Sequence, residues 1–227
     1  IVTDPDGTRR SIWPSKWPLD FLESIEGSRA YAKNYANDPL GADGDYWSES
    51  DFKYGEPDGP ISAVVLSIDP AVTTGKASDP TGLAIVGYAP AVKQAVVYAA
   101  EAAALTGDAL RSRVLELLDT WPEITMVLIE TNQGGDLWRQ ILHGLPVKIH
   151  TVHQSAKKET RAAWALAHYQ RGRVWHAERL NALEEQMVAF PRAAHDDLLD
   201  AVGTVVLKML GVPQRRVVRV ASTDYAS

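Results

Sequence analysis

The sequence predicts an α/β protein, in which a mixed central sheet of three antiparallel strands and then parallel strands is flanked by helices. Three short runs rich in β-forming residues follow one another closely between residues 63 and 98. From residue 106 onward, helical and strand patterns alternate, which is typical of helices packed on a sheet. The continuous apolar runs at 63–68 and 126–129 favour central strands that are covered on both faces.

The first 60 residues are expected to form an extension that precedes the main domain. They are rich in Trp, Pro, Gly and Asp, and a helical period of apolar residues is found between Pro18 and Tyr35, where we expect a helix. The run Pro57-Asp58-Gly59-Pro60 is typical of a break between structural units. We therefore expect a linker or extension at 1–60, a main domain at 61–212 and a C-terminal tail at 213–227.

Within the main domain the order of elements follows from apolar periodicity and from turn residues. Strands are expected at residues 63–68, 82–88 and 91–98, and the short Ala89-Pro90 break makes the last two adjacent and antiparallel. The elements that follow are a helix at 106–120, a strand at 126–129, a helix at 136–143, a strand at 147–152, a helix at 155–170, a short strand at 173–175 and helices at 178–188 and 196–210. This order is that of a ribonuclease H-like sheet, and it brings the C-terminal ends of the central strands together at one edge.

The overall composition is that of an ordinary soluble domain. Of its 227 residues, 45% are apolar and 23% are charged. Since no run approaches the roughly 20 apolar residues of a membrane span and no signal-peptide pattern is found, we expect a soluble, intracellular protein. The absence of cysteine excludes disulfides, zinc-cysteine sites and thiol catalysis.

The net charge of -6 is distributed unevenly along the chain. Residues 1–60 hold twelve acids and six Lys or Arg, whereas residues 61–227 hold seventeen of each. Between Lys148 and Arg192 there are eight Lys or Arg and four acids. This stretch could form a basic surface for nucleic acid, or equally a solvated charged face.

Two of the expected strands end in a single carboxylate. Asp69 follows the first central strand, and Glu130 follows Val127-Leu128-Ile129. An ionised carboxylate beside a core must be hydrated, hydrogen-bonded or bound to a cation. Taken singly, Asp69 before Pro70 could be a turn residue and Glu130 a helix-capping residue. The repetition of the pattern favours a function.

The third group of acids opens the last expected helix. Asp196 and Asp200 are four residues apart and share one helical face, while Asp197 points about 100° away. Acids in a first helical turn are favoured by the helix dipole by roughly 0.3–1 kcal/mol without any function. However, three acids within five residues repel one another, and a cation would relieve that repulsion.

Together the three acidic segments match a two-metal centre, in which ions about 3.5–4 Å apart hold the attacking and leaving oxygens of a phosphodiester. Magnesium and manganese prefer such all-oxygen ligands. His195 is interpreted as a residue at the entry to the helix rather than as a ligand. Lys157, Lys158 and Arg161 could hold a phosphate backbone, although each could equally be a solubilising charge.

An ordered set of motifs at these positions resembles the C-terminal nuclease domain of tailed-bacteriophage terminase large subunits, which are DNA-packaging motors. The motifs are Ser67-Ile68-Asp69-Pro70-Ala71, Asp79-Pro80-Thr81-Gly82, Ile129-Glu130-Thr131-Asn132-Gln133-Gly134-Gly135-Asp136, Lys157-Lys158-Glu159-Thr160-Arg161-Ala162, Phe190-Pro191 and His195-Asp196-Asp197-Leu198-Leu199-Asp200-Ala201. The segment from Tyr31 to Pro39 also resembles the stretch that follows the ATPase domain of this family.

The resemblance implies a ribonuclease H-like endonuclease that cuts concatemeric viral double-stranded DNA with Mg²⁺ or Mn²⁺. It implies that Asp69, Glu130 and the pair Asp196-Asp197 are the catalytic metal ligands, with Asp200 as a further ligand or a structural acid. The family's N-terminal ATPase motifs are not found in this sequence. The resemblance also implies the portal, the small terminase subunit and an ATPase domain as partners, and the cytoplasm of an infected bacterium as the location.

Two other interpretations share parts of this evidence. A Holliday-junction resolvase would have the same fold and carboxylates, but it should dimerise and prefer branched DNA. A non-catalytic DNA-binding or docking module of a packaging motor would bind DNA without cutting it. Cleavage of linear and four-way DNA distinguishes the three.

Overall fold

The computed structural model describes residues 1–26, 31, 46–71, 80–132 and 135–213, and its centre is one six-stranded mixed sheet. The strand order is β7-β6-β3-β4-β5-β8. The strands are β3 (Ala63–Asp69), β4 (Thr81–Ala89), β5 (Gln94–Ala103), β6 (Ile124–Glu130), β7 (Lys148–Val152) and β8 (Val174–His176). β3, β4 and β5 pair antiparallel, whereas β6, β7 and β8 each join the sheet through a parallel pairing. The expected ribonuclease H-like mixed sheet is thereby confirmed.

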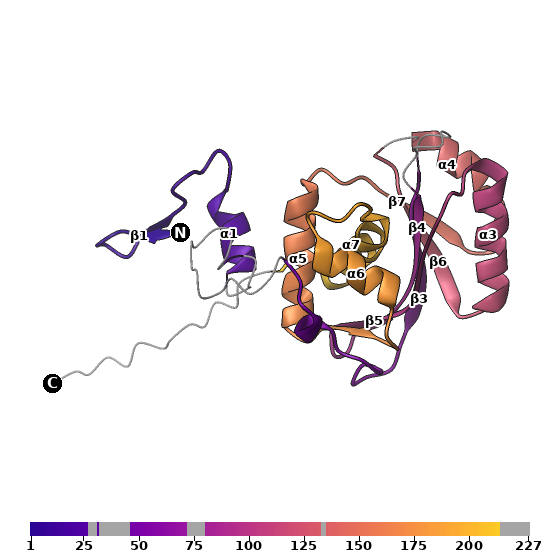
Figure 1. Ribbon diagram of the computed structural model, residues 1–227, viewed down its shortest axis with the longest axis horizontal. Helices are drawn as coiled ribbons and strands as arrows, with labels where there is room; N and C mark the ends of the chain where they lie inside the picture. The colour runs from indigo at the N-terminus through magenta and orange to yellow at the C-terminus, as the bar shows by residue number, and fades with distance from the viewer. Residues whose placement is uncertain (27–30, 32–45, 72–79, 133–134, 214–227) are drawn as a thin grey trace.

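Helices cover both faces of this sheet (Figure 1). On one face lie α3 (Gly107–Thr120) and α4 (Gly135–Ile141), and on the other lie α5 (Lys158–Gln170), α6 (Asn181–Ala189) and α7 (Asp197–Leu210). β3 is buried from Val64 to Ile68, as expected for a central strand between two helical layers. The core therefore consists of two clusters, one on each face of the sheet.

The expected elements are present, with shifts at their ends. The third strand was expected to begin at residue 91, but residues 90–93 form a turn in which the Lys93 amide bonds to the Pro90 carbonyl at 3.2 Å. Lys93 has a positive φ of 54°, so it cannot continue the strand. β5 instead runs from Gln94 to Ala103 and pairs with the whole length of β4. No described helix is long and apolar enough to cross a membrane.

The N-terminal region adds elements that the sequence did not predict. β1 (Val2–Thr3) and β2 (Arg9–Arg10) form a short hairpin, and a 3-10 helix η2 covers Glu49–Asp51. The helix expected from Pro18 to Tyr35 is α1 (Leu19–Ile25), and most of the remainder lies outside the described residues. The hairpin and α1 lie beyond α5, on the side away from the sheet (Figure 1).

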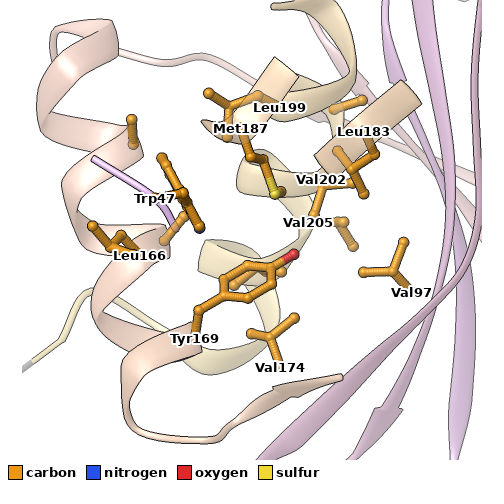
Figure 2. Packing of buried hydrophobic residues seen from close by; sticks show 14 of the residues in the cluster. Trp47, Val97, Leu166, Tyr169, Val174, Leu183, Met187, Leu199, Val202 and Val205 are labelled. Atoms are coloured by element: carbon orange, nitrogen blue, oxygen red, sulfur yellow. The ribbon is translucent and has the colours of Figure 1, made fainter. Parts of the chain in front are cut away.

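Residues just before the expected start of the main domain pack into its core. Trp47 is 1% exposed and lies between α5 and the α6–α7 layer, close to Tyr169 and Met187 (Figure 2). Phe52 stacks on His176 of β8 at a ring separation of 5.3 Å. The division at residue 61 remains a prediction, but residues 46–52 share the hydrophobic cluster of α5, α6 and α7.

Candidate functional site

The two strand-end carboxylates lie at the same edge of the sheet because β3 and β6 are parallel neighbours. The last registered pair of these strands is Ile68 with Ile129, so the next residues, Asp69 and Glu130, are the final residues of β3 and β6 and lie side by side. Glu130 is 9% exposed, and Asp69 is half-buried. The structure thus places these two predicted site residues together.

Asp69 is also close to the acids of the last helix. The pKa of Asp69 is raised to about 8, chiefly by burial and also by the negative charges of Asp200, Glu130 and Asp197, while Lys158 opposes the rise. Like charges have this effect only at short range in a poorly hydrated environment. Carboxylates from β3, β6 and α7 therefore converge on one site.

α7 is held against the sheet where these acids lie. The Ser67 hydroxyl of β3 donates to the Ala201 carbonyl at 2.8 Å, and both groups are buried. Gly82 of β4 lies opposite Asp69 in the sheet, and a Cβ at Gly82 would stand 2.2 Å from the carbonyl oxygen of Asp197. A glycine at this position is what lets the first turn of α7 approach the strand.

Two cations of α5 neutralise part of this charge. Arg161 donates to both oxygens of Glu130 at 3.1 and 3.2 Å and to Asp200 at 3.0 Å. Lys158 forms ion pairs with Asp196 and with Asp200, the latter at 2.7 Å. Two of the three predicted DNA-binding residues therefore face the acids in this structure, while Lys157 is exposed at the N-cap of α5.

Glu130 has one more neighbour that the sequence did not reveal. Thr204 of α7 donates to Glu130 at 3.4 Å, and the Gln154 amide donates in turn to the Thr204 hydroxyl at 3.1 Å. Thr204 resembles any polar residue in an apolar helix, so no sequence signal identified it. Gly82 did carry a signal, because a glycine inside a strand indicates close backbone approach.

The donor set suits a hard divalent cation. All five predicted ligands are carboxylates, and Mg²⁺ and Mn²⁺ prefer oxygen ligands. Within the described residues, no three acidic or histidine side chains are already arranged to hold one ion. This agrees with the ion pairs, because Lys158 and Arg161 occupy carboxylate oxygens that a metal would need. His195 is exposed before the N-cap of α7.

Comparison with known proteins gives likenesses in structure. No protein-family model matches the chain, and no curated protein matches it. The large terminase from the thermophilic bacteriophage D6E superposes with a TM-score of 0.55 and 10% identity, over 72% of this chain and 44% of that one. The human cytomegalovirus terminase nuclease domain, Mn-soaked and inhibitor-bound, has a TM-score of 0.50 and 17% identity, over 72% of this chain and 94% of that one.

This chain thus spans less than half of the D6E protein but nearly all of the cytomegalovirus nuclease domain. At these identities the likeness is one of fold. The chain has the ribonuclease H-like fold of the terminase nuclease domains.

Proposed function

We propose that this chain is the nuclease domain of a viral genome-packaging terminase and that it hydrolyses phosphodiester bonds of double-stranded DNA with divalent metal ions. The observation that carries the proposal is the convergence of Asp69 with Glu130, Asp197 and Asp200, whose charges add to the effect of burial in raising the pKa of Asp69 to about 8. A protein that gained nothing from this arrangement would be more stable without it, because buried like charges are unfavourable.

In this proposal Asp69, Glu130, Asp196 and Asp197 hold the metal, and Asp200 is a further ligand. Bound Mg²⁺ or Mn²⁺, as a pair of ions, would lower the pKa of water and offset the charge that develops on the phosphate. Arg161 orients Glu130 and Asp200 through its two-sided ion pair. Lys157 is exposed and free to contact a DNA phosphate, while Lys158 and Arg161 could do so only after leaving their carboxylates.

The partners proposed are double-stranded DNA, an ATPase domain in the same full-length protein, the portal and a small terminase subunit. The D6E large terminase, of which this chain covers 44%, supports the idea of a longer protein. In that setting, residues 1–60 would connect the nuclease to the ATPase domain, residues 61–212 would form the nuclease and residues 213–227 a tail. The place of action proposed is the cytoplasm of an infected bacterium.

The test is cleavage of supercoiled plasmid with Mg²⁺, with Mn²⁺ and with EDTA, for the parent chain, Asp69→Asn and Asp108→Asn. Asp108 is an exposed acid in the first turn of α3, so its variant controls for the loss of one carboxylate. We expect metal-dependent cutting by the parent and by Asp108→Asn, and none by Asp69→Asn. Cutting that persists in Asp69→Asn would contradict the proposed site.

Substrate choice separates the alternatives in the same assay. A strong preference for four-way junctions over linear DNA would favour a resolvase. DNA binding without cutting under any metal would favour a docking module, and binding that weakens steeply with salt would show that the contacts are mainly to phosphates.

A further inference from the structure

The first turn of α7 is capped in an unusual way. Asp196 is the N-cap residue, and an aspartate at that position ordinarily accepts a hydrogen bond from the amide of the second or third helical residue. In the described structure the Asp196 side chain makes no such capping bond. Its carboxylate is paired with Lys158 of α5 instead.

A side chain from another helix takes the place of the cap. Gln186 of α6 accepts a hydrogen bond from the Leu198 amide, through Oε1, at 3.0 Å. Leu198 is the second residue of α7, so its amide is one that the N-cap side chain would normally satisfy. Leu198 is 1% exposed, and a buried amide without a partner costs about 1–3 kcal/mol.

The chemistry of Gln186 suits this position. Its amide oxygen accepts a hydrogen bond without adding a negative charge beside Asp196, Asp197 and Asp200. A glutamate would accept the same bond but would increase the repulsion among the acids. α6 packs against the helical layer through the buried side chains of Leu183 and Met187 (Figure 2), and Gln186 lies on the same helix.

We propose that Gln186 is a positioning residue, which caps α7 so that the Asp196 carboxylate remains directed at the acid site. Without the Gln186 oxygen, the buried Leu198 amide and the helix dipole would both draw Asp196 back into the capping position. The capping role of Gln186 rests on its hydrogen bond with the Leu198 amide and on the absence of a capping bond from Asp196. Its consequence for metal binding rests on the proposed function.

The capping statement is tested by urea unfolding in EDTA. The variants are Gln186→Met, which keeps the length of the side chain and removes the acceptor, and Asp196→Ala in the parent and in the Gln186→Met background. We expect Asp196→Ala to lower the urea midpoint more strongly in the Gln186→Met background, where Asp196 has become the cap. Asp196→Asn, which can still cap, should not lower it in that background. An equal effect of Asp196→Ala in both backgrounds would overturn the proposal.

The metal consequence is tested by the Mn²⁺ dependence of plasmid cleavage. Gln186→Met should raise the half-saturating Mn²⁺ concentration about 10-fold, with the maximal rate unchanged, because residues that orient metal ligands affect affinity on this scale. Gln186→Glu retains an acceptor for the Leu198 amide, so Asp196→Ala should lower the urea midpoint no more in the Gln186→Glu background than in the parent, although the added charge lowers the midpoint of Gln186→Glu itself. Gln140→Met, the same exchange at an exposed residue of α4, should change neither measurement.

The results distinguish a failure of the proposed function from a failure of the role proposed for Gln186. If the parent chain cuts no DNA with either metal, the proposed function is wrong, but the urea comparison still judges the capping role of Gln186. If the parent cuts and Gln186→Met has the parent's Mn²⁺ dependence, the positioning role is wrong and the proposed function stands.

Discussion

At the scale of the residue, the electrostatics of the site are clearest at Asp69. Its half-buried carboxyl group, at the end of β3, is poorly hydrated and lies near three other acids, so its pKa is raised from 3.8 to about 8. Lys158 opposes this rise but does not cancel it. The charge of the site is therefore only partly compensated by the chain itself.

The raised pKa of Asp69 predicts that the stability of Asp69→Asn relative to the parent depends on pH in EDTA. Because the folded-state pKa exceeds the unfolded value, the stability that protonated Asp69 contributes is full below about pH 4 and is lost as the pH rises through about 8. Asn is neutral throughout, so the variant should gain stability over the parent progressively between these values. Urea midpoints at several pH values measure the difference. A constant difference across this range would mean that Asp69 ionises normally.

Gly82 is required for a steric reason. A Cβ there would meet the Asp197 carbonyl oxygen at 2.2 Å, so Gly82→Ala must push α7 away from the sheet. We expect it to destabilise the protein by about 1–3 kcal/mol, as overpacking does, and to abolish metal-dependent cleavage. Chemical denaturation and the plasmid assay measure the two effects.

The control for this variant is Gly203→Ala, inside α7. The nearest atom to a Cβ added there is the Cβ of Ala165, at 4.0 Å. There we expect a gain of about 0.5–1 kcal/mol, because Ala restricts the unfolded chain and favours the helix. If Gly82→Ala behaved like Gly203→Ala, the close contact would have no role.

At the scale of elements, α5 and α7 are joined at both ends. Lys158 and Arg161 near the start of α5 bind acids at the start of α7. At the other end, His168 Nε2 contacts the Gly211 carbonyl, at the C-cap of α7, at 2.8 Å. The two helices therefore run in the same direction, and apolar residues fill the space between them.

The hydrogen bond between His168 and Gly211 predicts a second dependence of stability on pH. Burial lowers the pKa of His168 to about 4, and the charges of Arg173 and Arg171 act in the same direction. Because the folded-state pKa lies below the usual 6.5, stability is full above about pH 6.5 and falls as the pH drops towards 4.

His168→Gln keeps a donor for Gly211 and does not titrate, so its stability relative to the parent should improve as the pH falls through this window. Thermal unfolding of both proteins from pH 7 to pH 4 measures the effect. A pH-independent difference would show that His168 is accessible to protons in the folded state.

At the scale of the whole molecule, the segment before the sheet is part of the core. Trp47 is 1% exposed and packs at edge-to-face angles against Tyr169 and Phe190. Tyr54 donates to Glu184 at 2.9 Å, and Glu184 also bonds to His176 at 2.8 Å. These contacts fasten residues 46–54 to α6 and β8.

Trp47→Ala should therefore destabilise the whole domain by about 3–5 kcal/mol, the usual cost of emptying a large aromatic site. Trp13 is 57% exposed, and Trp13→Ala should cost no more than about 0.5–1 kcal/mol, the scale of its contact with Lys16. Urea unfolding compares the two variants. Equal effects would mean that the segment around Trp47 is not part of the cooperative unit.

Much of this architecture was predictable because it depends on local pattern. Runs of apolar residues indicated β3 and β6 as central strands, and a carboxylate at the end of each indicated a shared edge. Parallel pairing of neighbours then requires Asp69 and Glu130 to meet. The acids at the start of α7 followed from spacing in the same way.

The sequence by itself therefore determined the order of the elements, the mixed sheet and the edge at which the acids gather, since periodicity and strand ends are local properties. Only the tertiary structure decided what surrounds those acids: Arg161 and Lys158 as their partners, Gly82 as the point of approach, and Gln186 as the cap of α7. These contacts join residues that are distant along the chain, and their geometry depends on how whole helices pack on the sheet.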